Sequence, residues 1–432
     1  MDTTSYNLPP AAERWQTRAL IIGVVALVIT AVIAFFSGSL THSGEAGVAQ
    51  GEAAAAAHGS TTFLAQFFRS YLVGFLFVTG ISVGSLAILM LQHLSGGSWG
   101  LVIRRILEAS TRTMPLLALM FIPIIFGIHS LYEWSHAEAV AADPILKHKS
   151  LYLNVPFFIG RAVFYFVVWG ALAYFLNKWS REQDHTGDPR VKRQMQNLSG
   201  PGILLFGLTV TFAAVDWGMS LEPHWFSTIY GMLVMAAWGL TAMAFTITAL
   251  VVLSRHDPMS HVYAPSHFHD LGKLLLAFVM IYAYFSFSQF LIIWSGDLPE
   301  ETSWYLRRLR GGWELIGLAV VILHFALPFV LLLSRDVKRN ARRLVLVALL
   351  VLVARVVDWI YLIAPASHQT EGHEQSLWPM LLLDFTTMFA ATVGLGGIWL
   401  WFFLRQLRQQ PLLPIGAPDL DKVLAAATTS QH

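Results

Sequence analysis

Long uninterrupted apolar runs recur along the whole chain, and they constrain its fold more than any other feature of the sequence. Each run has roughly 20 residues, enough to cross a bilayer as an α-helix. A transmembrane β-barrel would instead show short segments of alternating polarity. The sequence therefore predicts an all-α polytopic membrane protein with about ten transmembrane helices. The runs lie at about 18–36, 71–94, 114–132, 151–178, 200–221, 225–253, 271–295, 313–334, 342–364 and 378–405.

The composition supports this prediction and excludes several other classes. Of the 432 residues, 56% are hydrophobic and only 12% are charged. The net charge of +2 is too small to indicate a nucleic-acid partner. The chain has no cysteine, which excludes disulfides and cysteine-ligated zinc or iron–sulfur centres.

The first apolar run follows Arg14 and Arg18, as the hydrophobic region of a signal peptide would. It is longer than such a region and lacks a clear small-x-small cleavage site, so a retained first helix is expected. The segment after it is rich in Gly, Ser and Ala, which predicts a loop, and the tail after Pro411 is expected to be loosely held. The predicted parts are a cytoplasmic tail (1–17), an integral membrane domain (18–405) with an extracytoplasmic loop (37–70), and a second cytoplasmic tail (406–432).

Lys and Arg are concentrated in every second connection between the predicted spans. These connections all lie on one side of the membrane, and an even number of spans places both termini on that side as well. The positive-inside rule therefore places both termini in the cytoplasm. The one discordant signal is a cluster of arginines at 307–310, which falls on the opposite side. The connections rich in these residues contain Arg104, Arg105 and Arg112, then Lys178, Arg181, Arg190, Lys192 and Arg193, then Arg335, Lys338, Arg339, Arg342 and Arg343.

A short bend at 213–231 joins two apolar runs in the middle of the chain and carries three ionisable groups. Asp216 approaches the bend, while Glu222 and His224 form it. Two spans joined so closely must lie antiparallel, and ionisable groups there are costly in lipid. The bend is therefore the first candidate site, expected at the outer face.

Other ionisable residues fall in the outer half of the predicted bundle. Their convergence at one depth indicates a hydrated, protein-lined cavity open to the outside. His129 and Glu133 are four residues apart, which would place them on one helix face and suit them to proton relay. The candidate residues are His129, Glu133, Arg161, Asp216, Glu222, His224, Asp358 and Asp384.

Several of these residues also have structural interpretations. Arg355 and Asp358 are three residues apart and can neutralise each other. Glu222 and Asp384 can lie among lipid headgroups. Asp216 is harder to explain in this way, because its own helix offers no nearby cation.

Two histidines lie near or within predicted spans. His93, at an inner helix end, is expected at the interface. His324, near mid-span, suits a hydrogen-bonding role in the core better than haem ligation, since no matched pair of deep histidines is present.

Polar residues also line the seventh predicted span. Tyr282, Tyr284, Ser286, Ser288 and Gln289 could conduct protons through the inner half or could form helix-packing hydrogen bonds. In the second span, Gly80 and Gly84 form a GxxxG pattern, which predicts a close helix–helix contact.

Three motifs carry a resemblance to a known family: HSLYEW at 129–134, SLEPHWFSTIYG at 220–231 and SQFLIIWSGDLPEE at 288–301. The sequence resembles the second, shorter polysulfide-reductase-type (NrfD-like) membrane subunit of bacterial alternative complex III, over nearly the whole chain. That complex is a quinol:cytochrome c or quinol:oxidase oxidoreductase of the inner membrane. The resemblance implies two four-helix bundles, helices two to five and six to nine, flanked by helices one and ten.

The resemblance also implies partners. They are a paralogous NrfD-like membrane subunit, an extracytoplasmic iron–sulfur subunit, multihaem cytochrome c subunits and a terminal oxidase. Haem c and iron–sulfur clusters are expected in those partners, with quinol as substrate, and no cofactor is expected on this chain.

Three functional hypotheses remain. In the first, the chain is a structural and proton-conducting subunit, with the outer acids and His129 as the exit half and Tyr282 and Gln289 in the inner half. In the second, the chain holds a quinol pocket, and His129 or Asp216 accepts the quinol proton. In the third, it is a stand-alone ion-coupled transporter, because midplane acids also mark that class.

Overall fold

The computed structural model describes residues 8–9, 11–44, 52–256, 259–367, 378–418 and 420. Every regular element in these ranges is helical, which confirms the predicted all-α class. Nine of the described helices are long and apolar enough to cross a membrane, and one bent pair makes a tenth span if it is counted as one. The chain is therefore a multi-pass integral membrane protein.

The spanning helices are close to the runs expected from hydropathy, and shorter helices lie between them. The spanning elements are α1 (Ala11–Gly44), α2 (Glu52–Ser95), α3 (Ser98–Thr111) with α4 (Met114–Phe126), α8 (Val155–Thr186), α9 (Pro189–Trp217), α10 (Tyr230–Leu253), α11 (Pro265–Gly296), α13 (Trp313–Val320) continuing through η5 (Val321–Ala326) into α14 (Leu327–Leu333), α16 (Ala341–Ile363) and α17 (Trp378–Leu407). The short elements are α5 (Ile128–Leu131), η2 (Glu133–Ser135), α6 (Ala137–Ala142), α7 (Pro144–Lys149), η3 (Met219–Leu221), η4 (Met259–His261), α12 (Pro299–Arg308), α15 (Arg335–Arg339) and η6 (Ala364–Ser367).

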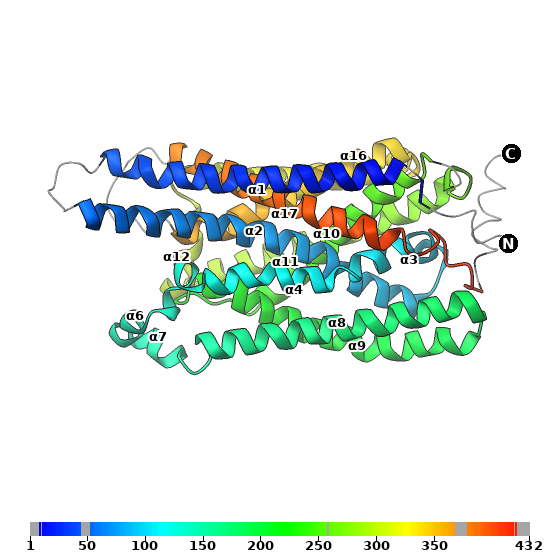
Figure 1. Ribbon diagram of the computed structural model, residues 1–432, viewed down its shortest axis with the longest axis horizontal. Coiled ribbons are helices and arrows are strands. Elements are labelled where there is room, and N and C mark those ends of the chain that lie inside the picture. Colours follow the sequence, from blue (N-terminus) through cyan, green and yellow to red (C-terminus); the bar gives the residue numbers. More distant parts are fainter. Residues whose placement is uncertain are drawn as a thin grey trace.

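The long helices lie roughly side by side along the length of the molecule (Figure 1). Helices α2, α3–α4, α8 and α9 contact one another, as do α10, α11, α13–α14 and α16. Helix α10 packs against α2 and α9 and so joins the two groups, while α1 and α17 pack together and against α2. This is the expected arrangement of two four-helix bundles with flanking first and last helices.

The two ends of the bundle can be named from the chain path. The terminal face is the end at which α1 begins and α17 ends, and the hairpin face is the opposite end, which holds α6, α7, α12 and the connection between α9 and α10 (Figure 1).

The third span differs from its predicted limits. It starts with α3, an amphipathic helix, and α4 follows at a bend of 40°. Arg104 and Arg105, which were predicted to lie in a loop, are therefore helical and only 3% and 1% exposed. Hydropathy missed α3 because its charged residues pair within the protein instead of facing water.

Two expected irregular segments are also more ordered than predicted. Helices α1 and α2 extend to Gly44 and from Glu52, into the 37–70 segment expected as a loop. After α17, the segment 411–418 lies against the protein, and the side chains of Leu412 and Leu413 are buried. The expectation of a loosely held tail is therefore wrong for this part of it.

The GxxxG pattern forms the close contact that it predicts. A Cβ atom on Gly80 would lie 2.6 Å from Cδ1 of Trp238, and one on Gly84 would lie 2.2 Å from the Trp238 carbonyl oxygen. Because only glycine leaves room for this approach, the two positions set the distance between α2 and α10, and thus between the two bundles.

Candidate functional site

Asp216 lies in a buried ion pair between α8 and α9. Arg161 donates from Nε to Oδ2 at 2.9 Å and from Nη2 to Oδ1 at 2.8 Å, which is a two-point guanidinium–carboxylate contact. Tyr165, one helical turn after Arg161, donates its hydroxyl to Oδ2 at 2.8 Å. We call these three residues the α8–α9 cluster. The cation that the α9 sequence lacks is thus supplied by the neighbouring helix.

Arg161 is itself held by the connection that precedes α8. Its Nη1 donates to the Tyr152 carbonyl oxygen at 2.9 Å, and the guanidinium lies over the rings of Tyr152 and Phe157, at 3.8 and 4.3 Å from their centroids. These contacts fix the guanidinium plane, so the cluster has little freedom to rearrange.

A second buried aspartate lies between α11 and α16. Asp358 Oδ2 accepts hydrogen bonds from Arg355 Nη1, on its own helix, and from the Tyr282 hydroxyl at 2.6 Å. His324 Nε2 lies 3.4 Å from the same Arg355 nitrogen, and the rings of His324 and Tyr282 are 4.3 Å apart. None of the four side chains is more than 3% exposed. We call them the α11–α16 cluster.

This second cluster contains polar atoms without partners among the described residues. They are Nδ1 of His324 and both Nε and Nη2 of Arg355. Buried polar atoms are nearly always satisfied by protein or by ordered water. The orphaned nitrogens therefore indicate a place for water or for a polar ligand.

The helix that carries His324 is also irregular. Residues Val321–Ala326 form a π-helical turn inside the span, a feature common at functional sites. Pro328 follows four residues after His324 and has no N–H to donate to the His324 carbonyl. The sequence thus explains why the helix departs from α geometry at the histidine.

Glu222, in the connection between α9 and α10, joins that connection to α12. Its carboxylate pairs with Arg307 at 2.8 Å and with Arg308 at 2.9 Å. Arg308 also donates to the carbonyl oxygens of Tyr361 and Leu362 and stacks on Trp304, with Cζ 3.5 Å from the ring centroid. Burial lowers the pKa of the Arg308 guanidinium, and the Glu222 carboxylate opposes this effect. Glu222 is therefore buried and paired within the protein, and two arginines of the discordant basic cluster at 307–310 have a structural partner.

His129 and Glu133 do not form the predicted pair. Helix α5 ends at Leu131, and Glu133 begins a separate 3₁₀ turn. Both side chains are exposed, and His129 Nδ1 lies 3.1 Å from the Ser135 hydroxyl. The spacing of four residues implies one face only if the helix is continuous, and here it is not.

His224 lies at the surface of the hairpin face, in the same connection as Glu222. Its Nε2 is 2.5 Å from Oδ2 of Asp143, the residue that caps α7. This hydrogen bond, together with two from backbone N–H groups, lowers the pKa of the Asp143 carboxyl. The contact joins α7 to the connection between α9 and α10.

The remaining candidates, Asp384 and Gln289, have separate partners. Gln66 Nε2 donates to Asp384 Oδ1 at 2.8 Å, between α2 and α17. Gln289 Oε1 accepts from Ser227 at 2.9 Å. In α11, Tyr282 is buried whereas Tyr284 is 66% exposed, so the predicted polar stripe divides between two faces of the helix.

A buried charge cluster at the terminal face is not predicted by the sequence patterns above. Glu108 accepts from Arg104 at 2.9 Å, from Arg105 at 2.6 Å and from the Ser180 hydroxyl at 2.5 Å. Arg105 also pairs with Asp184 of α8. The spacing of three and four residues within 104–108 is an ion-pair signal on a helix, but the hydropathy of this segment predicts a loop, where that spacing has no such meaning.

A search of protein-family models and a search of curated proteins found no match to this chain. The helices and their buried charge pairs define the class, a polytopic all-α integral membrane protein.

Proposed function

We propose that this chain is an integral subunit of a quinol-oxidising respiratory complex of the alternative complex III type, in the bacterial inner membrane. The proposal rests on the three motifs that resemble the NrfD-like subunit. On this proposal the terminal face is cytoplasmic, and the redox centres belong to partner subunits at the hairpin face.

The spatial relationship of the three motifs supports the proposal. Trp225 of the second motif donates to the Glu301 carbonyl oxygen of the third at 3.1 Å, and Ser227 bonds Gln289. Tyr132 of the first motif donates to the carbonyl oxygen of Trp217, just before the second, at 3.1 Å. Motifs far apart in sequence thus share one end of the bundle, as expected if they shape one docking surface.

Within such a complex, we propose that this chain carries protons, and the α11–α16 cluster is the observation that supports this role. It brings an aspartate, a tyrosine and a histidine together inside the protein, where ionisable groups are rare without a function. The orphaned nitrogens of Arg355 and His324 provide the sites at which water would complete a proton path.

The quinol-pocket alternative makes a different demand on the structure. Asp216 already accepts three hydrogen bonds, from Arg161 and Tyr165, so only one of the roughly four acceptor positions of its carboxylate is left for a quinol hydroxyl. The α11–α16 cluster favours the conducting role, because its unpartnered nitrogens can bind the water that a proton path needs.

The test uses variants that remove one proton-carrying group and leave the ion pair in place. Tyr282→Phe and His324→Gln, each in the assembled complex in vesicles, should lower the number of protons moved per electron while quinol oxidation continues. Tyr71→Phe is the matched control, because Tyr71 is also buried and donates to a backbone carbonyl, that of Met120, instead of to an acid. An unchanged proton-to-electron ratio in both test variants would refute the conducting role.

Membership of the complex is tested separately. Affinity purification of the chain from its native membrane in mild detergent should bring down haem-containing and iron–sulfur proteins. A haem-free preparation that catalyses solute uptake by itself would instead support the ion-coupled transporter.

A further inference from the structure

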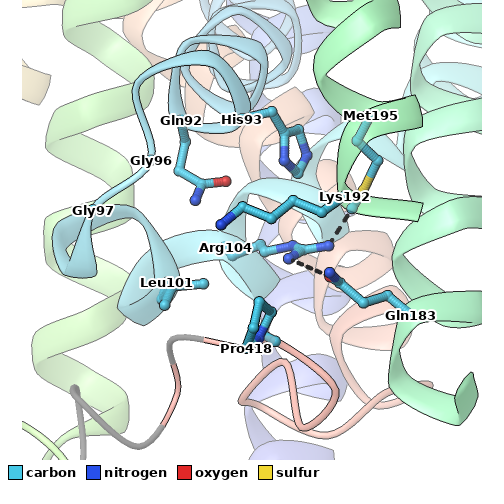
Figure 2. A pocket seen from close by; sticks show the side chains of 11 residues that line it. Gln92, His93, Gly96, Gly97, Leu101, Arg104, Gln183, Lys192, Met195 and Pro418 are labelled. Atoms are coloured by element: carbon cyan, nitrogen blue, oxygen red, sulfur yellow. Dashed lines mark hydrogen bonds between the residues drawn. The ribbon is translucent and has the colours of Figure 1, made fainter. Parts of the chain in front are cut away.

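A small cavity lies at the terminal face, between α2, α3, α8, α9 and the C-terminal segment (Figure 2). Its volume is about 30 Å³, room for two or three water molecules. His93 and Gln92 extend into it from the end of α2, towards Arg104 of α3 and Lys192 of α9 (Figure 2). Gln183 of α8 completes its polar wall.

Two of the lining side chains have polar atoms without partners. His93 and Gln92 are each only 5% exposed, so both are buried within the protein at the end of α2. His93 Nε2 and Gln92 Oε1 make no hydrogen bond with any described residue. A buried imidazole nitrogen and a buried amide oxygen that face one cavity are hydrogen-bonding partners for ordered water.

The C-terminal segment borders this cavity at the terminal face. Ala417 and Pro418 form part of its wall. The segment is held by Gln410, which accepts from Arg105, and by Gly416, whose N–H donates to Asp184 at 3.4 Å. A Cβ on Gly416 would lie 1.9 Å from the Gln183 carbonyl oxygen, so the segment packs directly on the backbone of α8.

We propose that this cavity is a hydrated chamber through which protons from the terminal face reach His93, with segment 411–418 as its lid. The inference rests on the proposed proton-conducting function. In each transfer a hydronium O–H bond breaks and an N–H bond forms at Nε2, with no change of oxidation state. The charged groups around the imidazole are Arg104 and Glu108 of α3 and Lys192 of α9.

Hydration is tested without any activity measurement, by hydroxyl-radical footprinting of the full chain. Met195 lines the cavity and is 0% exposed. Met243 in α10 is also 0% exposed and does not line the chamber, so it is the matched control. Radicals formed from bound water should oxidise Met195 and spare Met243. Equal protection of both methionines would overturn the chamber.

The role of His93 is tested in the assembled complex. His93→Gln should slow proton uptake on the order of 100-fold, the lower end of what a positioned proton-transfer group contributes. His185→Gln, on the exposed end of α8, should leave uptake unchanged. Equal uptake in the two variants would refute the role of His93. If Tyr282→Phe still lowered the proton-to-electron ratio in that case, the proposed function would stand without this chamber.

The lid is tested by thiol labelling, which is clean because the chain has no native cysteine. Leu101→Cys places a thiol in the chamber wall. Leu107→Cys, on the same helix, places one in the apolar core of the protein. Adding Gly416→Ala should speed labelling at position 101 severalfold and leave position 107 unreactive. An unchanged rate at position 101 would refute the lid.

Discussion

Arg161 and Asp216, which are 55 residues apart in sequence, form a two-point ion pair that joins α8 to α9 inside the membrane domain. Arg161 is 9% exposed and Asp216 is 0% exposed. The pair lets a buried carboxylate remain in an apolar bundle, because each charge is the counter-ion of the other. The same chemistry recurs in the second bundle, where Asp358 accepts from an arginine and a tyrosine.

Removing one partner of this pair should cost more than removing both. Arg161→Met leaves the Asp216 carboxylate buried and unpaired, which should lower the free energy of unfolding by about 3–5 kcal/mol. The double variant Arg161→Met with Asp216→Leu should recover most of that loss. Unfolding in mixed detergent measures both. A double variant no more stable than the single one would show that the cost of Arg161→Met does not come from leaving Asp216 unpaired.

Replacing Arg308 with lysine should destabilise the protein. A lysine keeps the charge but cannot reach Glu222 and the carbonyl oxygens of Tyr361 and Leu362 together while stacking on Trp304. Arg308→Lys should therefore lower stability by about 1–3 kcal/mol, the cost of unsatisfied buried groups. The matched control, Arg310→Lys, should have an effect within about 0.5 kcal/mol, because that side chain is exposed. Equal effects would contradict the anchoring role of Arg308.

Gly84→Ala should separate the two bundles slightly. The new methyl group would lie 2.2 Å from the backbone oxygen of Trp238, which cannot rotate away. Such overpacking costs about 1–3 kcal/mol. The matched control is Gly170→Ala, which adds the same methyl group but places it in open space. This variant should be neutral or stabilising. The thermal unfolding temperature should therefore fall in Gly84→Ala and not in Gly170→Ala, and an equal fall in both variants would show that the α2–α10 contact does not limit stability.

The contact between Asp143 and His224 should weaken in acid. The pKa of Asp143 lies below its ordinary value of 3.8, chiefly because of the hydrogen bond with His224. A carboxyl with a lowered pKa in the folded state stabilises that state above its ordinary pKa and loses the contribution as the pH falls through the lowered value. His224→Gln should raise the Asp143 pKa towards 3.8, and His148→Gln, also exposed and nearby, should not. Isotope-edited infrared spectroscopy across a pH titration measures the protonation of the Asp143 carboxyl directly. An Asp143 pKa that is the same in both variants would contradict the assignment.

Local signals in the sequence predicted several features correctly. Run length predicted the spans, because a helix must be about 20 apolar residues long to cross a bilayer. The spacing of Arg355 and Asp358 predicted their pairing on one helix, and the GxxxG pattern predicted a close approach at Gly80 and Gly84. Each of these features depends only on residues that are close together in the sequence.

Signals that assumed a continuous helix or a solvated loop were misleading. His129 and Glu133 have helical spacing, but the chain turns between them. Arg104 and Arg105 resemble loop charges by hydropathy, yet they are buried with Glu108. In both cases the local pattern is present in the sequence, but the surrounding structure determines which residues it brings together.

The sequence by itself determined that this chain is a bundle of membrane-spanning helices and where most of them lie, because hydrophobic length is a local property. Only the tertiary structure decided that Arg161 reaches Asp216, that Arg308 reaches Glu222 and that Tyr282 reaches Asp358. These contacts depend on how each helix is rotated about its axis and which neighbour it faces. That rotation results from the packing of the whole bundle, so no single stretch of sequence contains it.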